Sequence, residues 1–152
     1  MELQTLNPKP DSPHMPKLSE SFSKFAKLTE ELKKHSLPAE LIESVNREIQ
    51  IVNLFSGSDK DLLKQLKTSR ASILKMLEKD LKLVPKNYYR NRWLALGMST
   101  FGMPLGVVFG LSLGNMAFLG IGLPIGMGIG IAVGTAQDKK AAESGKQLDV
   151  EA

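Results

Sequence analysis

The sequence predicts an all-α protein: a small N-terminal cytoplasmic bundle of about three helices, followed by a two-helix transmembrane hairpin. The hairpin is indicated by residues 93–137, where 45 consecutive positions contain no Asp, Glu, Lys, Arg or His. The same stretch holds 11 of the chain's 13 glycines, many of them four residues apart. The bundle is indicated by residues 18–84, in which apolar residues recur at helical spacing between proline and glycine breaks.

Residues 1–17 precede the bundle and carry four prolines without hydrophobic periodicity, so we expect a disordered arm there. No signal peptide is visible in this arm, which predicts that the N-terminal domain stays on the side where it is made.

Three amphipathic helices are expected in the bundle, over residues 19–35, 38–55 and 59–83. Pro38 suits the first turn of the second helix. The third helix has the strongest start signal, because Ser58 can cap it and acidic residues follow in its first turn. The apolar stripes are Phe22, Phe25, Leu28 or Thr29, and Leu32 in the first helix, Leu41, Ile42, Val45, Ile49, Val52 and Phe55 in the second, and Leu62, Leu63, Leu66, Ile73, Leu74, Leu77 and Leu81 in the third.

These stripes are typical of the core of an antiparallel three-helix unit. At about 65 residues the core would be small, so we expect its stability to depend on the membrane, a partner or another copy. The alternative interpretation is a coiled-coil or helix-in-groove surface, through which residues 18–84 bind a cytoplasmic protein partner.

Aromatic rings and cations gather at both ends of the uncharged run, as a membrane interface requires. We interpret residues 85–92 as an interfacial linker. The tip of the hairpin has no positive charge, so the positive-inside rule predicts a multi-pass protein of the cell inner (plasma) membrane with both termini cytoplasmic. The interfacial residues are Tyr88, Tyr89, Arg90, Arg92 and Trp93 before the run, and Lys139 and Lys140 after it.

A basic aromatic run can also bind RNA. The adjoining apolar run favours a membrane instead, and no nucleic-acid partner is expected.

The length of the run suits two membrane spans, since about 20 helical residues cross a hydrocarbon core of about 30 Å. The spans are predicted at residues 93–113 and 116–136, with a turn at Gly114 and Asn115. Residues 138–152 are interpreted as a polar tail that extends the second helix for a turn or two and is disordered beyond Gly145.

Two glycine ladders with a period of four mark one face of each span and predict close helix packing. The ladders are Gly102, Gly106, Gly110 and Gly114, and Gly122, Gly126, Gly130 and Gly134. A further row of small residues lies about 200° away on the second span and predicts a homo-oligomer formed mainly through that helix. Its members are Gly120, Pro124, Gly128, Ala132 and Ala136. The alternative is that both rows serve only the hairpin and its lipid contacts.

Pro104 and Pro124 are each ten residues from Gly114 and therefore share a depth in a symmetric hairpin. Each proline removes a backbone donor, which predicts a tolerated kink. The alternative is a widened cavity or hinge near the middle of the membrane.

Composition offers little for catalysis. The net charge of +4 is spread as mixed signs, which suits a solvated surface beside anionic lipid headgroups. The chain has no cysteine, and nothing beside its two histidines, His14 and His35, completes a metal site. Phosphate-binding loops and HExxH motifs are also missing from the sequence. We expect no catalytic residue, no metal, no cofactor and no enzymatic activity.

The stretches GMPLGVVFGLSLG and GLPIGMGIGIAVG resemble the glycine-zipper membrane segments of small bacterial proteins. The resemblance implies tight, often homo-oligomeric helix packing, in proteins that are either pores or passive anchors. We therefore expect a self-associating hairpin that anchors a cytoplasmic partner-binding domain, in other words a scaffold or adaptor. The alternative is an oligomeric pore or channel, which requires a wettable lumen. The lumen candidates are Ser99, Thr100, Ser112, Asn115 and Thr135.

Overall fold

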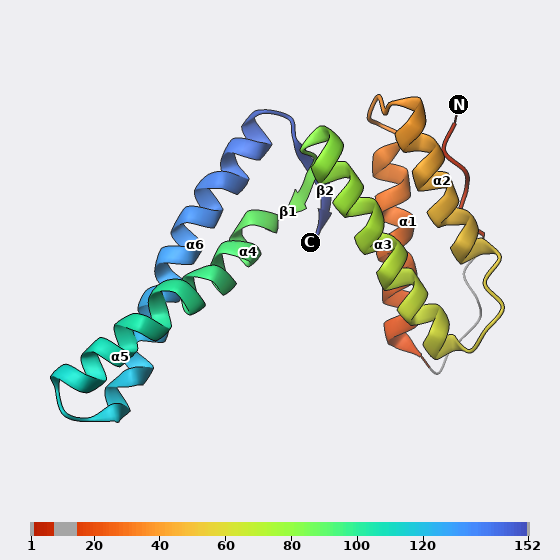
Figure 1. Ribbon diagram of the computed structural model, residues 1–152. Helices are drawn as coiled ribbons and strands as arrows, with labels where there is room; N and C mark the ends of the chain where they lie inside the picture. The colour runs from red at the N-terminus through yellow and green to blue at the C-terminus, as the bar shows by residue number, and fades with distance from the viewer. Residues whose placement is uncertain (1, 8–14, 152) are drawn as a thin grey trace. The chain divides into compact units, whose positions relative to one another are not determined.

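The computed structural model describes residues 2–7 and 15–151 of the chain, and they are mostly helical, as expected (Figure 1). The chain divides into two compact units, one of Met1–Leu83 with Leu148–Val150 and one of Val84–Gln147 with Glu151–Ala152. The longer segment of the first unit contains α1 (Pro16–Leu32), α2 (Ala39–Asn53) and α3 (Asp59–Leu81). The second unit contains two apolar helical stretches that pack on each other.

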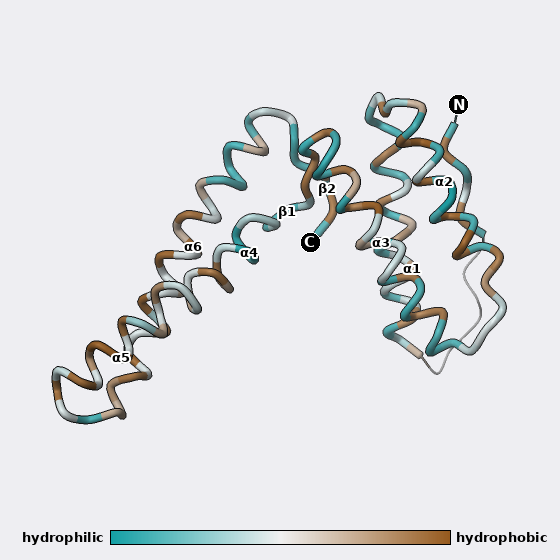
Figure 2. Tube along the Cα trace, viewed as in Figure 1, coloured by the Kyte–Doolittle hydropathy of each residue, from teal (hydrophilic) through white to brown (hydrophobic). Residues whose placement is uncertain are grey.

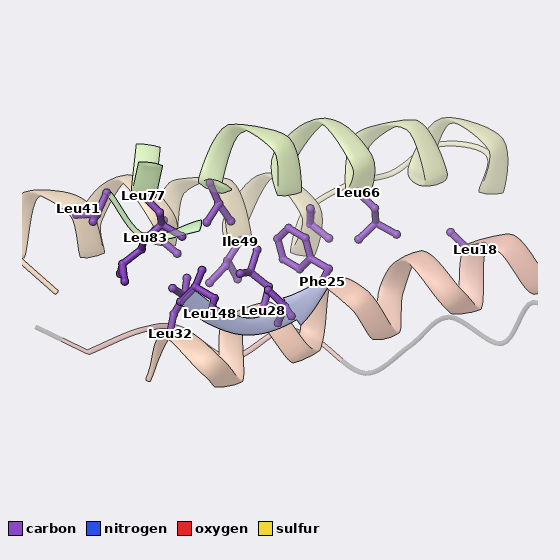
Figure 3. Packing of buried hydrophobic residues seen from close by; sticks show 14 residues of the cluster. Leu18, Phe25, Leu28, Leu32, Leu41, Ile49, Leu66, Leu77, Leu83 and Leu148 are labelled. Atoms are coloured by element: carbon purple, nitrogen blue, oxygen red, sulfur yellow. The ribbon is translucent and has the colours of Figure 1, made fainter. Parts of the chain in front are cut away.

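The first unit is the expected three-helix bundle. α3 contacts both α1 and α2. Its start signal is confirmed, because the Asp61 N–H donates to the Ser58 Oγ at 3.3 Å. The buried apolar residues of the three helices meet in one core (Figure 3), which includes Leu18, Phe25, Leu28, Leu32, Leu41, Val45, Ile49, Val52, Leu66, Ile73 and Leu77. Side chains at helical spacing therefore form the core, as the apolar stripes predicted.

The C-terminal residues also belong to this core. β2 (Gln147–Glu151) alternates polar and apolar residues, and it buries Leu148 completely and Val150 almost completely. Figure 3 shows Leu148 among the core leucines of the helices. The expectation of a polar tail that is disordered beyond Gly145 is therefore wrong. The physical reason is the period of two, which gives this short segment one apolar face to bury.

The last helix, α6 (Leu119–Glu143), ends before this strand. Gly145 has a φ of 67°, a left-handed conformation that favours glycine, and the Lys146 N–H donates to the Ala141 carbonyl at 2.8 Å. β2 forms a two-stranded sheet with β1 (Val84–Lys86), which the all-α prediction did not include.

The hairpin consists of two continuous helical stretches, Tyr88–Ser112 and Met116–Glu143, each long and apolar enough to cross a membrane. The first contains α4 (Tyr88–Gly97), η1 (Met98–Gly102) and α5 (Met103–Ser112). The second contains η2 (Met116–Phe118) and α6 (Leu119–Glu143). Figure 2 shows hydrophobic residues alternating with pale, nearly neutral ones along the hairpin, and hydrophilic colours where α4 begins and toward the end of α6.

One boundary differs from the prediction, and another agrees with it. Residues 85–92 are not a linker, because β1 ends at Lys86 and α4 begins at Tyr88. The second helix extends past position 137 for almost two turns, as expected, because α6 runs to Glu143. The apolar run marks where charge is absent, whereas the helix is longer than that run.

The turn of the hairpin lies at Gly114 and Asn115, as predicted. Gly114 has a φ of 64°, which favours glycine, and the Asn115 Oδ1 accepts from the Ala117 N–H at 2.9 Å. Asn115 thus caps the returning helix.

The first stretch contains a π-helical turn, η1, which ends two residues before Pro104. The Met103 N–H donates to the Met98 carbonyl, the i→i+5 pattern of a π-helix. The Ser99 hydroxyl also donates to the Ala95 carbonyl at 3.1 Å. Pro124 lies inside α6, which continues as an α-helix on both sides of it. The two prolines therefore have different surroundings, which the symmetric prediction did not foresee.

Candidate functional site

The two helical stretches of the hairpin meet along a seam of buried glycines. Seven of the eight ladder glycines lie in this glycine seam, and the eighth, Gly114, forms the turn. A Cβ added to Gly122 would lie 2.6 Å from the Gly106 Cα, and one added to Gly126 would lie 2.6 Å from the Gly102 nitrogen. Such distances allow only a hydrogen atom at these positions. Backbone therefore packs directly on backbone along the seam.

Gly97 joins the seam although the ladder period did not include it. It is buried, and a Cβ there would clash with the Gly126 carbonyl oxygen. Gly97 lies five residues before Gly102, and the π-helical turn between them brings both glycines to the same face. The spacing of five residues between Gly97 and Gly102, where the other ladder glycines are four apart, could have predicted both the place of Gly97 in the seam and the π-helical turn.

The second small row of α6 faces away from the seam, as its phase predicted. All five of its members are exposed: Gly120, Pro124, Gly128, Ala132 and Ala136. Around a Cβ built at Gly120 or Gly128, no described atom beyond the adjacent residues and backbone of the same helix lies within 4 Å. This outer row is a strip on which another helix backbone can approach closely.

The rest of the outward surface of the hairpin is apolar and large. Val108 is 56% exposed and Leu111 is 68% exposed. The other large exposed residues are Leu96, Phe101, Met103, Val107, Phe109, Leu113, Met116, Ile121, Ile125 and Ile129. Small residues lie inside and large apolar residues outside, which reverses the arrangement of a domain folded in water.

The predicted interfacial residues gather at the base of the hairpin, where α4 begins and α6 ends. Tyr88 and Tyr89 are half-buried and meet edge to face, with ring centroids 5.2 Å apart. Trp93 is also half-buried, and the exposed cations are Arg90, Arg92, Lys139 and Lys140. The apolar surface of the hairpin is thus bordered at its base by amphipathic rings and cations.

Asp138 closes the base of the hairpin. Its carboxylate is buried on α6 and accepts the Tyr89 N–H at 3.0 Å and the Arg90 N–H at 2.9 Å. These are orphan donors of the first turn of α4, where a carboxylate also favours the helix dipole. Asn87, which precedes α4, has a left-handed backbone and supplies no cap among the described side-chain contacts. Asp138 therefore caps one helix from the other.

Replacing Asp138 with alanine should free the first turn of α4 and destabilise the hairpin by about 1.5–3 kcal/mol, the usual contribution of hydrogen bonds to a charged group. Asp138→Asn keeps one acceptor and should cost less. Hydrogen exchange at the amides of Tyr89 and Arg90 measures the effect. Glu143→Ala is the control, because its 3.9 Å pairing with Lys139 is exposed. Unchanged protection in Asp138→Ala would contradict the capping role.

A second candidate site lies on α2, where residues 2–7 dock against the bundle. Asn46 accepts the Gln4 N–H at 2.8 Å and donates to the Glu2 carbonyl at 3.0 Å. Its amide thus bridges the backbone on either side of Leu3. The expectation of a disordered arm is wrong for this segment, while residues 1 and 8–14 lie outside the described residues.

Asn53 repeats the same arrangement around Leu6. It accepts the Asn7 N–H at 2.8 Å and donates to the Thr5 carbonyl at 3.1 Å. Seven helical residues separate the two asparagines, or about 10.5 Å. Three extended residues separate the two leucines, or about 10 Å. The registers match, so α2 presents two equivalent amides to an extended chain.

The docked segment is held weakly. Its hydrogen bonds are exposed, and Leu3 and Leu6 are only half-buried against the core. Each hydrogen bond contributes about 0.5–1.5 kcal/mol, and a fully buried leucine about 1.5–3 kcal/mol. Ordering each backbone residue costs about 1–2 kcal/mol. These contributions nearly cancel over residues 2–7, so docking of the segment adds little to the stability of the bundle.

Glu31, on α1, accepts a hydrogen bond from the backbone of β2. Its carboxylate accepts from the Lys34 Nζ at 2.7 Å and from the Asp149 N–H at 3.3 Å, and it lies 3.7 Å from the His35 Nε2. The Lys34 hydrogen bond, helped by the Asp149 N–H, lowers the pKa of Glu31 below its ordinary value of 4.5 against the effect of burial.

A lowered pKa means that the charged form of Glu31 stabilises the folded unit. This stability is present above about pH 4.5 and is lost as the pH falls through the pKa of the folded state. Glu31→Gln keeps an acceptor but loses the charge, so it should cost about 0.5–1.5 kcal/mol at pH 7 and flatten this part of the acid dependence. Thermal unfolding between pH 3 and pH 7 measures both effects. Glu43→Gln is the control, because Glu43 is exposed on α2. Equal acid profiles for the two variants would contradict the role of Glu31.

Within residues 2–7 and 15–151, no cluster of three or more His, Cys, Asp or Glu residues could hold a metal ion. Comparison with protein-family models, curated protein sequences and solved structures gives no match for this chain. The geometry of the hairpin and the bundle is therefore the basis for assigning a function.

Sequence reasoning missed Asp138, the asparagine pair and β2. Asp138 had a signal, since a carboxylate toward the C-terminal end of a helix opposes the helix dipole and needs a compensating partner. Asn46 and Asn53 had a weaker one, their spacing of seven on one helix face. For β2 the signal was the alternation of Leu148 and Val150 with charged residues.

Proposed function

We propose that this chain is a non-enzymatic integral membrane protein, in which a transmembrane hairpin anchors a cytoplasmic helical domain that binds a partner. The observation that carries the proposal is the reversed composition of the hairpin. Its seam consists of glycines, while its exposed surface consists of large apolar side chains such as Val108 and Leu111. Lipid tolerates such a surface, and water does not.

The path of the chain supports two crossings rather than one. Leu148 and Val150 belong to the same core as the helices that precede the hairpin. The segments before and after the hairpin must then lie on one side of any membrane that it crosses. This requires an even number of crossings, which agrees with two helices of suitable length.

The cytoplasmic side is supported by charge. Arg90, Arg92, Lys139 and Lys140 are exposed at the base, while residues 93–137, which include the tip, carry no charge. Positive residues remain on the cytoplasmic side and meet anionic lipid headgroups there. We assign the protein to the inner (plasma) membrane on this basis.

Flotation with liposomes tests the membrane assignment. The purified full chain should float with vesicles, resist extraction at alkaline pH and release no trapped dye. A chain that remains in the supernatant without detergent would contradict the membrane proposal. Dye release would favour the pore alternative, in which the hairpins surround a water-filled lumen.

We further propose that copies of the hairpin associate through the outer row of α6. Gly128→Leu should reduce the oligomer fraction measured by cross-linking in detergent, because it places a large side chain on a strip that is otherwise small. Val108→Leu is the matched control, since Val108 is already a large exposed residue. Equal oligomer fractions in both variants would show that the row faces lipid only.

A further inference from the structure

Residues 2–7 lie against α2 and are held there by their backbone, and we call the surface that they cover the groove. Asn46 and Asn53 each pair with one carbonyl and one N–H of the segment. These contacts do not depend on the side chains of the segment, so any extended chain with suitable apolar residues meets the same donors and acceptors.

The present occupant does not fill the groove. A cavity of about 460 Å³ lies beside Leu3. Its apolar lining comes from Leu3, Leu32, Leu37 and Ile42. The cavity is open to solvent and has polar as well as apolar lining, so a larger apolar side chain at position 3 would bury more apolar surface against Leu32, Leu37 and Ile42.

Polar residues of the same cavity set a second preference. Lys33 and His35 line it together with Glu2, which directly precedes Leu3. Lys33 is exposed and positively charged, so an acidic residue before the large apolar residue is favoured at this place.

The affinity that a free segment needs in order to displace residues 2–7 is set by their covalent link to the bundle. Because residues 2–7 belong to the same chain, they occupy the groove at an effective concentration that is in the millimolar range for short linkers. A free segment of equal fit therefore cannot displace them at ordinary concentrations. A better fit is needed, and the cavity beside Leu3 shows where it can be gained.

We propose that this groove binds an extended segment of a partner protein, in which an acidic residue precedes an aromatic residue and a leucine follows three positions after the aromatic one. Residues 2–7 of the chain itself are the placeholder that this segment displaces. The inference deepens the proposed adaptor function and rests on it, since it names the class of partner that the anchored domain recruits.

Two labelled peptides test the groove: residues 1–7 of the chain, and the same peptide with Leu3→Trp. The receptor is the full chain in detergent with Leu3→Ser and Leu6→Ser, which weaken its own placeholder and keep both asparagines. Fluorescence anisotropy should show at least tenfold tighter binding of the Leu3→Trp peptide. Adding Asn46→Ala and Asn53→Ala to the receptor should weaken that binding at least tenfold. Thermal unfolding of each receptor checks that it is folded.

Absence of binding, or affinity that ignores the two asparagines, would overturn the proposal. Equal affinity of the two peptides would also overturn it, because the groove would then suit the N-terminal segment of a second copy as well as an aromatic partner. A second measurement does not depend on added peptide. The full chain with Leu3→Trp should slow hydrogen exchange at the Gln4 and Asn7 amides at least tenfold, and unchanged exchange would contradict the role of the cavity.

Liposome flotation of the same proteins separates the two proposals. If the chain floats and no peptide binds, the groove proposal is contradicted and the membrane assignment is not. The membrane assignment fails independently of the groove when the chain binds the peptide and stays in the supernatant.

Discussion

Gly122→Leu should separate the two helices of the hairpin, whereas Gly128→Leu should leave them packed. A Cβ on Gly122 would lie 2.6 Å from the Gly106 Cα, so a leucine there must push one helix backbone away from the other. Overpacking usually costs about 1–3 kcal/mol, and a contact between two backbones places the expected loss above about 3 kcal/mol. At Gly128 no described atom beyond the adjacent residues and backbone of the same helix lies within 4 Å of the added Cβ.

The single tryptophan of the chain reports this separation. Trp93 lies on α4, and a Cβ added to Gly130 of the seam would lie 2.8 Å from the Trp93 carbonyl carbon. Trp93 fluorescence in detergent should therefore change, and its thermal transition should fall, in Gly122→Leu only. The two variants have the same composition and lie on the same helix. Equal transitions for Gly122→Leu and Gly128→Leu would contradict the packing of the glycine seam.

Leu148→Ala should destabilise the N-terminal bundle by about 2–5 kcal/mol, although Leu148 follows that bundle by more than 60 residues. Leu148 is fully buried among the core residues of the helices, so its removal leaves a cavity. A loss of this size is a large part of the 5–15 kcal/mol that is typical of a whole domain. The C-terminal strand is therefore a structural part of the bundle.

Urea unfolding of the full chain in mild detergent, followed by circular dichroism, measures this effect. Leu54→Ala is the matched control, because Leu54 is 78% exposed and its truncation should change the stability by less than about 0.5 kcal/mol. Similar midpoints for the two variants would show that β2 does not stabilise the bundle.

The sequence was sufficient for the parts of the fold that depend on period and charge. Apolar residues at helical spacing gave the three helices of the bundle, and the uncharged run with Gly114 and Asn115 gave the hairpin and its turn. The four-residue glycine period predicted the seam, because a face of glycines can be recognised in one helix without knowing which helix packs against it.

The rest depends on contacts between residues far apart in the chain. Asp138 caps a helix that begins 50 residues earlier, at Tyr88, and Leu148 completes a core formed by the first part of the chain. The pairing of Asn46 with the backbone around Leu3 likewise joins distant residues. A local sequence pattern can indicate that a buried polar or apolar group needs a partner, but it does not identify which distant residue that partner is.

The central claim is that the hairpin crosses a membrane and returns, so that its tip and its base lie on opposite sides. The chain has no cysteine, so single cysteines can be introduced at Ser36 in the bundle, at Leu113 beside the tip and at Ser144 beyond the base. An impermeant maleimide applied to the outer face of intact cells should label Leu113→Cys alone. Ser36→Cys and Ser144→Cys should react only after the membrane is opened. Equal labelling of all three variants before the membrane is opened would contradict the claim.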